Sequence, residues 1–221
     1  RAVFTPCKVQ QDTKAILSAY RQTGHYLAQV TPELIRRDQN RVDVIFNIQE
    51  GDKSEVRQIE FIGNKHFSTS DLKGTIATKQ AAFWRIFGSS TSYDPDKLEF
   101  DKELLRRFYM NKGYADFQVV SAVAELAPGR EDFFITFTLD EGVRYDFGQI
   151  DVDIDGRVPV EKQELLDSIT IDSGDLFDDS RIATNVDNIV NILGQEGFAF
   201  LEAVPQFRKN KEQQTVDVTF K

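Results

Sequence analysis

Residues 93–114 read YDPDKLEFDKELLRRFYMNKGY, and this stretch decides the fold because it has the marks of one amphipathic helix. Asp94 can cap the helix N-terminus, and Pro95 fits the first turn, where no backbone N–H is needed. Large side chains recur at spacings of seven and four, which place them on one helix face: Leu98, Leu105 and Tyr109. Gly113 fits the left-handed residue that ends a helix. The stretch therefore predicts a helix that packs one face against other structure.

The same pattern occurs three times along the chain. Each copy opens with an aromatic residue, at Phe4, Tyr93 and Phe177. Twenty residues later each copy has a glycine, at Gly24, Gly113 and Gly197. Apolar residues stand five, twelve and sixteen positions after each opening aromatic, and another aromatic follows each glycine within two residues. These aligned features predict an internal repeat, and we interpret the three glycines as structural helix ends.

A β-hairpin is predicted after each helix. In the second copy, the apolar stretches 119–126 and 133–139 flank a polar turn, which is the pattern of two paired strands. A further strand with alternating apolar residues, 56–62, precedes the helix. It runs through Gly63 and Asn64, interpreted as structural turn residues, into a shorter helix. The repeating unit is therefore β-α-α-β-β.

This order of elements predicts an α+β fold in which each unit is a three-stranded mixed sheet covered on one face by two helices. The two-helix crossover permits parallel pairing of the first strand with the last. Residues 133–139 form the most continuously apolar strand and are expected in the middle of the sheet. Residues 119–126 are then left at an edge, with unpaired backbone groups.

The repeats divide the sequence into three parts. Residues 1–53 (repeat 1) contain only the second half of the unit, so we expect the chain to begin inside a repeat and to be part of something longer. Residues 54–142 (repeat 2) form a complete unit, and residues 143–221 (repeat 3) form most or all of another. The linkers are short, because only a few residues separate Gly51 from Val56 and Gly142 from Phe147. A semi-rigid row of modules is expected.

The composition excludes several classes of function. A formal net charge of −9 argues against nucleic acid and against an anionic membrane surface, since both need clustered Lys and Arg. No apolar run is long enough to form a membrane-spanning helix. The single Cys7 cannot form an internal disulfide.

Catalytic and metal motifs are also missing from the sequence. His25 and His66 are the only histidines, and they do not have metal-ligand spacing. Residues 151–156, DVDIDG, resemble half of a calcium-binding loop, but Lys162 stands where the bidentate Glu should be. Aspartates that alternate with Ile and Val are typical of a solvated strand face. We therefore expect no enzymatic activity, no cofactor, no metal site and no small-molecule substrate.

Three segments in this order resemble the POTRA domain: IEFIGN at 59–64, LLRRFYMNKGYA at 104–115 and LDEG at 139–142. The whole chain resembles the POTRA region of Gram-negative outer-membrane protein assembly factors. By this resemblance repeat 1 is the end of the second module of that region, repeat 2 the third and repeat 3 the fourth. Repeat 3 departs from the pattern, because its first strand ends in Asp155-Gly156 instead of Gly-Asn.

The resemblance implies a location on the periplasmic side of the bacterial outer membrane. It implies as partners unfolded outer-membrane β-barrel precursors and accessory lipoproteins, with membrane attachment only through a C-terminal barrel outside this sequence. Two alternatives remain open. The modules could belong to a two-partner secretion transporter or an import channel, or they could be a structural spacer that holds a pore.

Two places are predicted to bind partners. The first is the edge strand, whose residues are small and carry no Lys or Pro: Val119, Val120, Ser121, Ala122, Val123 and Ala124. An edge without such guards can pair with an extended peptide. The second is the aromatic insertion at 83–87, where Trp84 and Phe87 either cap their own core or dock on a partner.

Overall fold

A computed structural model describes residues 5–39, 41–81, 91, 93–127, 132–154, 160–195 and 202–221. Packing divides the chain into two compact units. The first comprises Arg1–Ile62, Thr69–Lys102 and Ser121–Phe137, and the second comprises Gly63–Ser68, Glu103–Val120 and Thr138–Lys221. The elements of repeat 2 are shared between the two units.

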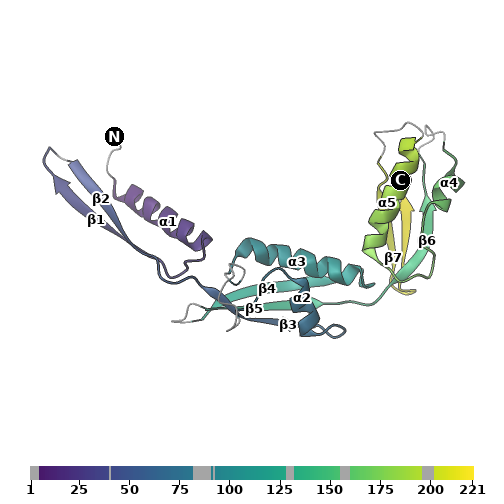
Figure 1. The fold of residues 1–221 in the computed structure, drawn as a ribbon, viewed down its shortest axis with the longest axis horizontal. Helices are drawn as coiled ribbons and strands as arrows, with labels where there is room; N and C mark the ends of the chain where they lie inside the picture. Colours follow the sequence, from purple (N-terminus) through teal and green to yellow (C-terminus); the bar gives the residue numbers. More distant parts are fainter. Residues whose placement is uncertain are drawn as a thin grey trace. The chain divides into compact units, whose positions relative to one another are not determined.

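Repeat 1 lies wholly in the first unit. Helix α1 (Pro6–Gln22) is followed by the hairpin strands β1 (Gln29–Arg37) and β2 (Arg41–Gln49), which pair antiparallel from Gln29 opposite Gln49 to Arg37 opposite Arg41. The helix runs beside this two-stranded sheet (Figure 1). None of its residues is buried.

Repeat 2 contains β3 (Glu55–Ile62), α2 (Thr69–Thr75), α3 (Pro95–Met110), β4 (Gln118–Leu126) and β5 (Asp132–Asp140). The strand order is β3-β5-β4, which confirms the prediction that the last strand lies in the middle and 119–126 at an edge. Every second residue of β5 is buried: Phe133, Ile135, Phe137 and Leu139. Helices α2 and α3 lie over the sheet (Figure 1).

Repeat 3 lies in the second unit and repeats this plan with β6 (Asp146–Val152), α4 (Lys162–Asp167), α5 (Asp179–Gln195), β7 (Pro205–Asn210) and β8 (Thr215–Phe220). The strand order is β6-β8-β7, with β6 parallel and β7 antiparallel to β8. The register of β6 shifts between Phe147 and Ile150, which marks a β-bulge. The core lies between the sheet and α5, where Phe147, Ile189 and Val218 are buried.

The helix ends follow the sequence pattern. Gly24 and Gly113 have φ values of 93° and 97°, the left-handed region favoured by glycine. The residue after each glycine donates its N–H back into the helix, from His25 to Tyr20 O at 2.9 Å and from Tyr114 to Tyr109 O at 3.0 Å. This is the bonding of a Schellman cap. Gly197 lies outside the described residues.

The helix starts are less uniform than the sequence suggested. Asp94 and Asp178 each accept a backbone N–H with their carboxylate, from Asp96 and Ser180, at 2.9 Å in both cases. Thr5 has the extended backbone of an N-cap but forms no side-chain capping hydrogen bond. Asp94 and Asp178 therefore each satisfy an otherwise free helix donor, and the Thr5 side chain does not.

Candidate functional site

The outer edge of repeat 2 is the strand β4. Its side chains are small or aliphatic from Val119 to Ala124, and Glu125 is the one formal charge among its nine residues. Val120 is 63% exposed and Val123 is 46% exposed. An apolar edge strand of this length, without Lys or Pro, is the kind that accepts an added strand.

One hydrogen bond of the hairpin shows which residues of β4 direct their backbone N–H and C=O groups outward, away from β5. Ala127 donates its N–H to Asp132 O across the hairpin at 3.1 Å. Because the backbone groups of an antiparallel strand alternate between its two sides, Glu125 and Val123 face β5 while Leu126 and Ala124 face outward. The burial pattern shifts phase by one residue at Ser121–Ala122, as a bulge would produce. Ala124 is therefore the outward residue best defined by the hairpin bonds.

The opposite edge of the same sheet, β3, is covered at its start. Val56 donates its N–H to Thr91 O at 2.8 Å and accepts the N–H of Ala81 at its own carbonyl, also at 2.8 Å. Both outward groups of Val56 are therefore satisfied within the chain. A partner strand cannot pair there without displacing these segments.

The edge strand β6 of repeat 3 is covered in the same way. Phe147 donates to Asp175 O at 2.7 Å and accepts from the N–H of Gly174 at 2.8 Å. Farther along, the N–H of Val152 is bonded by the neighbouring Asp151 carboxylate at 2.9 Å. These contacts occupy groups that an added strand would need.

The other edge of repeat 3, β7, is guarded by its composition. It has six residues, starts at Pro205 and carries Arg208 and Lys209. Val204 and Lys221 bond each other in both directions, so alternation places Pro205, which has no N–H, at an outward position. Of the four edges described in the two complete repeats, β4 is the one without a cover, a Pro or a Lys.

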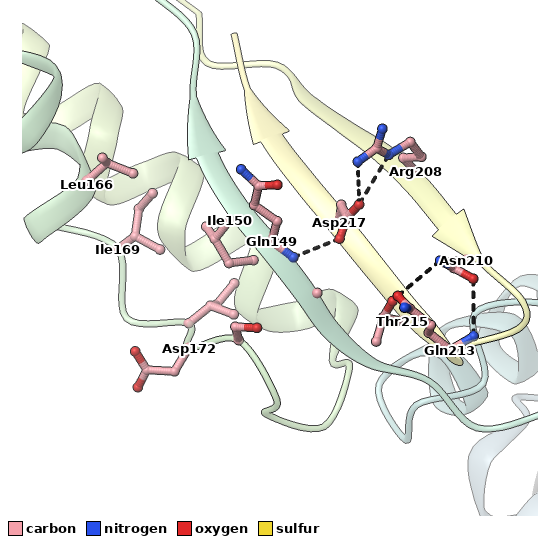
Figure 2. A pocket seen from close by; sticks show the side chains of 13 residues that line it. Gln149, Ile150, Leu166, Ile169, Asp172, Arg208, Asn210, Gln213, Thr215 and Asp217 are labelled. Atoms are coloured by element: carbon pink, nitrogen blue, oxygen red, sulfur yellow. Dashed lines mark hydrogen bonds and ion pairs between the residues drawn. The ribbon is translucent and has the colours of Figure 1, made fainter.

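Figure 2 shows a pocket of about 790 Å³ beside β6. Ile150, Leu166 and Ile169 contribute apolar side chains. On its polar side, Asp217 accepts the N–H of Gln149 at 2.7 Å and the guanidinium of Arg208 at 2.8 and 3.1 Å. The Asp217 carboxylate therefore holds the β6 bulge in place, and its pKa is below the ordinary value because of the Gln149 N–H and Arg208.

A buried carboxylate, Glu141, forms a network with Tyr109 and His66. Glu141 is 4% exposed, accepts the Tyr109 hydroxyl at 2.8 Å and lies 2.6 Å from Nδ1 of His66. Burial would raise the pKa of Glu141, but hydrogen bonds from His66 and Tyr109 outweigh this effect and lower it. Repeat 1 has an equivalent bond from Tyr20 to Glu50 at 3.0 Å, which is exposed. Because this Tyr–Glu hydrogen bond recurs at equivalent positions, we interpret it as a structural contact that joins the long helix to the end of the last strand.

Sequence reasoning missed two buried polar residues with equivalent roles. Asp101 and Asn185 stand eight residues after the opening aromatic of their repeats, and both are fully buried. Asp101 accepts the Ala77 N–H at 2.6 Å, and Asn185 accepts the Thr170 N–H at 2.6 Å. Each side chain fastens the loop after the short helix to the long helix. A polar residue on the apolar helix face was the signal that could have revealed them.

The remaining predicted positions have different outcomes. Gly63 has φ 93°, and the Asn64 amide donates to Phe67 O at 3.0 Å, so both form the turn after β3. Trp84 and Phe87 lie outside the described residues and stay candidate contacts. The calcium-like loop is only partly described, and there Asp151 pairs with Lys162 at 2.6 Å. Within the described segments no three His, Cys, Asp or Glu side chains are grouped to hold a metal.

The same segments contain no helix that is long and apolar enough to cross a membrane. Nothing in the geometry described above assembles a nucleophile with a base. Repeat 2 presents an apolar edge strand, β4, with Val120 and Val123 exposed.

Comparisons with known proteins agree with this plan. The sequence model of the POTRA family, described as "Surface antigen variable number repeat", matches residues 1–51, 54–142 and 148–221. The outer membrane protein assembly factor BamA of Neorickettsia risticii is 29% identical over 219 residues, which are 99% of this chain and 29% of that protein. BamA of Neisseria meningitidis serogroup B is 27% identical over 214 residues, 97% of this chain and 27% of that protein.

Among solved structures, POTRA3-5 of Haemophilus influenzae BamA superposes with a TM-score of 0.57 at 17% identity, covering 100% of this chain and 82% of that one. This match supports the fold. The chain spans less than a third of the length of the two BamA relatives.

Proposed function

Because the chain belongs to the POTRA family, we propose that its repeats are polypeptide-binding modules of an outer-membrane β-barrel assembly factor. They act on the periplasmic side of the outer membrane. Their clients are unfolded barrel precursors, and their stable partners are accessory lipoproteins. The contact is strand augmentation along β4, in which an extended segment pairs with the free backbone of Val119–Ala124.

The observation that carries this proposal is the contrast between β4 and the other three sheet edges described in repeats 2 and 3. Loops cover the outward groups of Val56 and Phe147, and Pro205 begins β7. β4 has none of these features and exposes Val120 and Val123. Exposed apolar edges are a hazard that proteins usually remove, so one that is retained indicates a use.

Strand addition also suits a protein with many clients. Backbone hydrogen bonds do not depend on side-chain identity, and each contributes about 0.5–1.5 kcal/mol net. A handful of such bonds, opposed by the cost of ordering the peptide, gives weak and reversible binding. A device that passes a client onward needs this reversibility.

Two other functions use the same fold. A structural spacer would hold a pore at a distance and would leave β4 unoccupied. A two-partner secretion transporter or import channel would read one dedicated substrate, and β4 would then be selective for that sequence. Titration with unrelated barrel-strand peptides distinguishes all three, because a spacer binds none, a dedicated reader binds one and an assembly module binds many.

The decisive test is Ala124→Pro, with Ala124→Val as the matched control. Proline removes the outward N–H that a partner strand would use, while valine keeps it. NMR titration of the full chain with an unfolded barrel-strand peptide should show shifts along β4, and the proline variant should bind several-fold more weakly than the valine variant. Equal affinities in two folded variants would eliminate augmentation at β4.

A further inference from the structure

The two linkers between repeats share one backbone arrangement. In the first joint (residues 24–27 with 51–54), Ser54 donates its N–H to Gly24 O at 2.9 Å. In the second joint (residues 113–116 with 142–145), Tyr145 donates its N–H to Gly113 O at 2.8 Å. In both joints, the carbonyl of the glycine that ends a helix therefore accepts a hydrogen bond from the linker that leads into the next repeat.

A second glycine recurs in each joint. Gly51 and Gly142 have φ values of 68° and 66°. A Cβ on Gly51 would lie 3.5 Å from Leu27 Cβ, and one on Gly142 would lie 3.1 Å from Asp116 Cβ. Leu27 and Asp116 are equivalent, since each follows its helix-ending glycine by three residues. The two joints therefore share a backbone and differ in the side chain at this position.

In the second joint that side chain is a carboxylate shared by three segments. Asp116 accepts the Tyr145 hydroxyl of the linker at 2.5 Å and pairs with Lys209 Nζ of β7 at 2.5 Å. Lys211 lies 3.8 Å from the same carboxylate. Burial would raise the pKa of Asp116, but bonds from Lys209 and Tyr145 outweigh it and lower the pKa.

In the first joint the equivalent positions carry no charge. Leu27 replaces the carboxylate, and Ser54 takes the place of Tyr145. The Ser54 hydroxyl is fully buried and has no hydrogen-bond partner among the described residues. The contact across this joint is aromatic instead: the Tyr26 ring packs edge-on against Phe133 at 4.8 Å and lies 5.6 Å from the Tyr93 ring.

We propose that charge holds the second joint in addition to the apolar packing of Met110 and Ala115 on the repeat 3 core, whereas aromatic packing holds the first. Ionic strength then changes the freedom of repeat 3 relative to repeat 2 but not that of repeat 1. Lys209 and Asp116 are 40% and 20% exposed at their side chains, so mobile ions reach the pair. Screening shortens the reach of such charges from about 10 Å at 0.1 M salt to about 3 Å at 1 M. Aromatic packing has no comparable dependence on salt.

Double electron–electron resonance on the full chain measures both joints. With Cys7→Ser as background, nitroxides at Glu99→Cys and Asp187→Cys report on the second joint, and at Gln11→Cys and Glu99→Cys on the first. In the otherwise unmodified chain, raising salt from 0.1 M to 1 M should broaden the distance distribution of the second joint alone. Asp116→Asn should give the broad distribution at 0.1 M and lose the salt response.

Two further variants keep the result decisive. Lys209→Met removes the cation of the same ion pair and should also give the broad distribution at 0.1 M salt without a salt response. It tests the ion pair independently if Asp116→Asn is unstable. Asp43→Asn breaks the surface pair with Arg37 in repeat 1 and should change neither joint. The proposal is overturned if Asp116→Asn or Lys209→Met leaves the width and salt response of the second joint unchanged, or if both joints respond to salt equally.

Discussion

Gly63 and Gly174 offer a paired test of how a glycine acts in this fold. Their φ values are 93° and 92°, so alanine meets the same backbone strain at both. They differ in their surroundings. A Cβ on Gly63 would lie far inside van der Waals distance of Leu139 O, a backbone atom at the end of β5, whereas a Cβ on Gly174 would meet nothing within 4 Å.

The expected costs follow from these two facts. A left-handed alanine costs about 1–2 kcal/mol, and the stiffer unfolded chain returns about 0.4–1 kcal/mol. Gly174→Ala should therefore destabilise repeat 3 by about 0.5–1 kcal/mol. Gly63→Ala must also displace β5 backbone, which adds about 1–3 kcal/mol as in overpacked cores. Its total is about 1.5–4 kcal/mol.

Hydrogen exchange followed by mass spectrometry measures the stability of repeat 2 and that of repeat 3 separately. Peptides from β5 report the opening free energy of repeat 2, and peptides from β8 report that of repeat 3. Gly63→Ala should lower the β5 value by the larger amount and leave β8 nearly unchanged. If Gly63→Ala and Gly174→Ala cost the same, the close approach at Leu139 is not what requires glycine at position 63.

Three further predictions concern folding, metal binding and pH. Residues 1–53 alone should show no cooperative thermal transition by circular dichroism, because α1 buries no residue, while residues 54–142 should show one. Calorimetry should detect no Ca²⁺ binding tighter than about 1 mM at Asp151 and its neighbours. The lowered pKa of Glu141 contributes stability above the ordinary Glu pKa that is lost as pH falls through the folded value. Glu141→Gln should therefore destabilise the protein at neutral pH and flatten the acid side of its pH–stability curve.

Local patterns predicted the elements well where one physical signal dominated. The apolar spacing and the glycine at 113 set the length of α3, because both act within one helix. The continuous apolar run at 133–139 correctly predicted β5 in the middle of its sheet, because central strands are more completely buried than edge strands. Strand ends carry weaker local signals: the strand predicted at 119–126 starts at Gln118.

The sequence by itself determined the repeat, the element types and the edge position of β4, because periodicity and helix-ending glycines are written into neighbouring residues. Only the tertiary structure decided which edges are open. Covering β3 and β6 requires backbone bonds to Thr91 and Asp175, which lie about 30 residues away. It also decided the role of Asp116, whose partner Lys209 is 93 residues distant. The partner of a carboxylate cannot be predicted from the local sequence, because an ion pair depends on the distance between two groups in the folded chain and not on the residues beside either one.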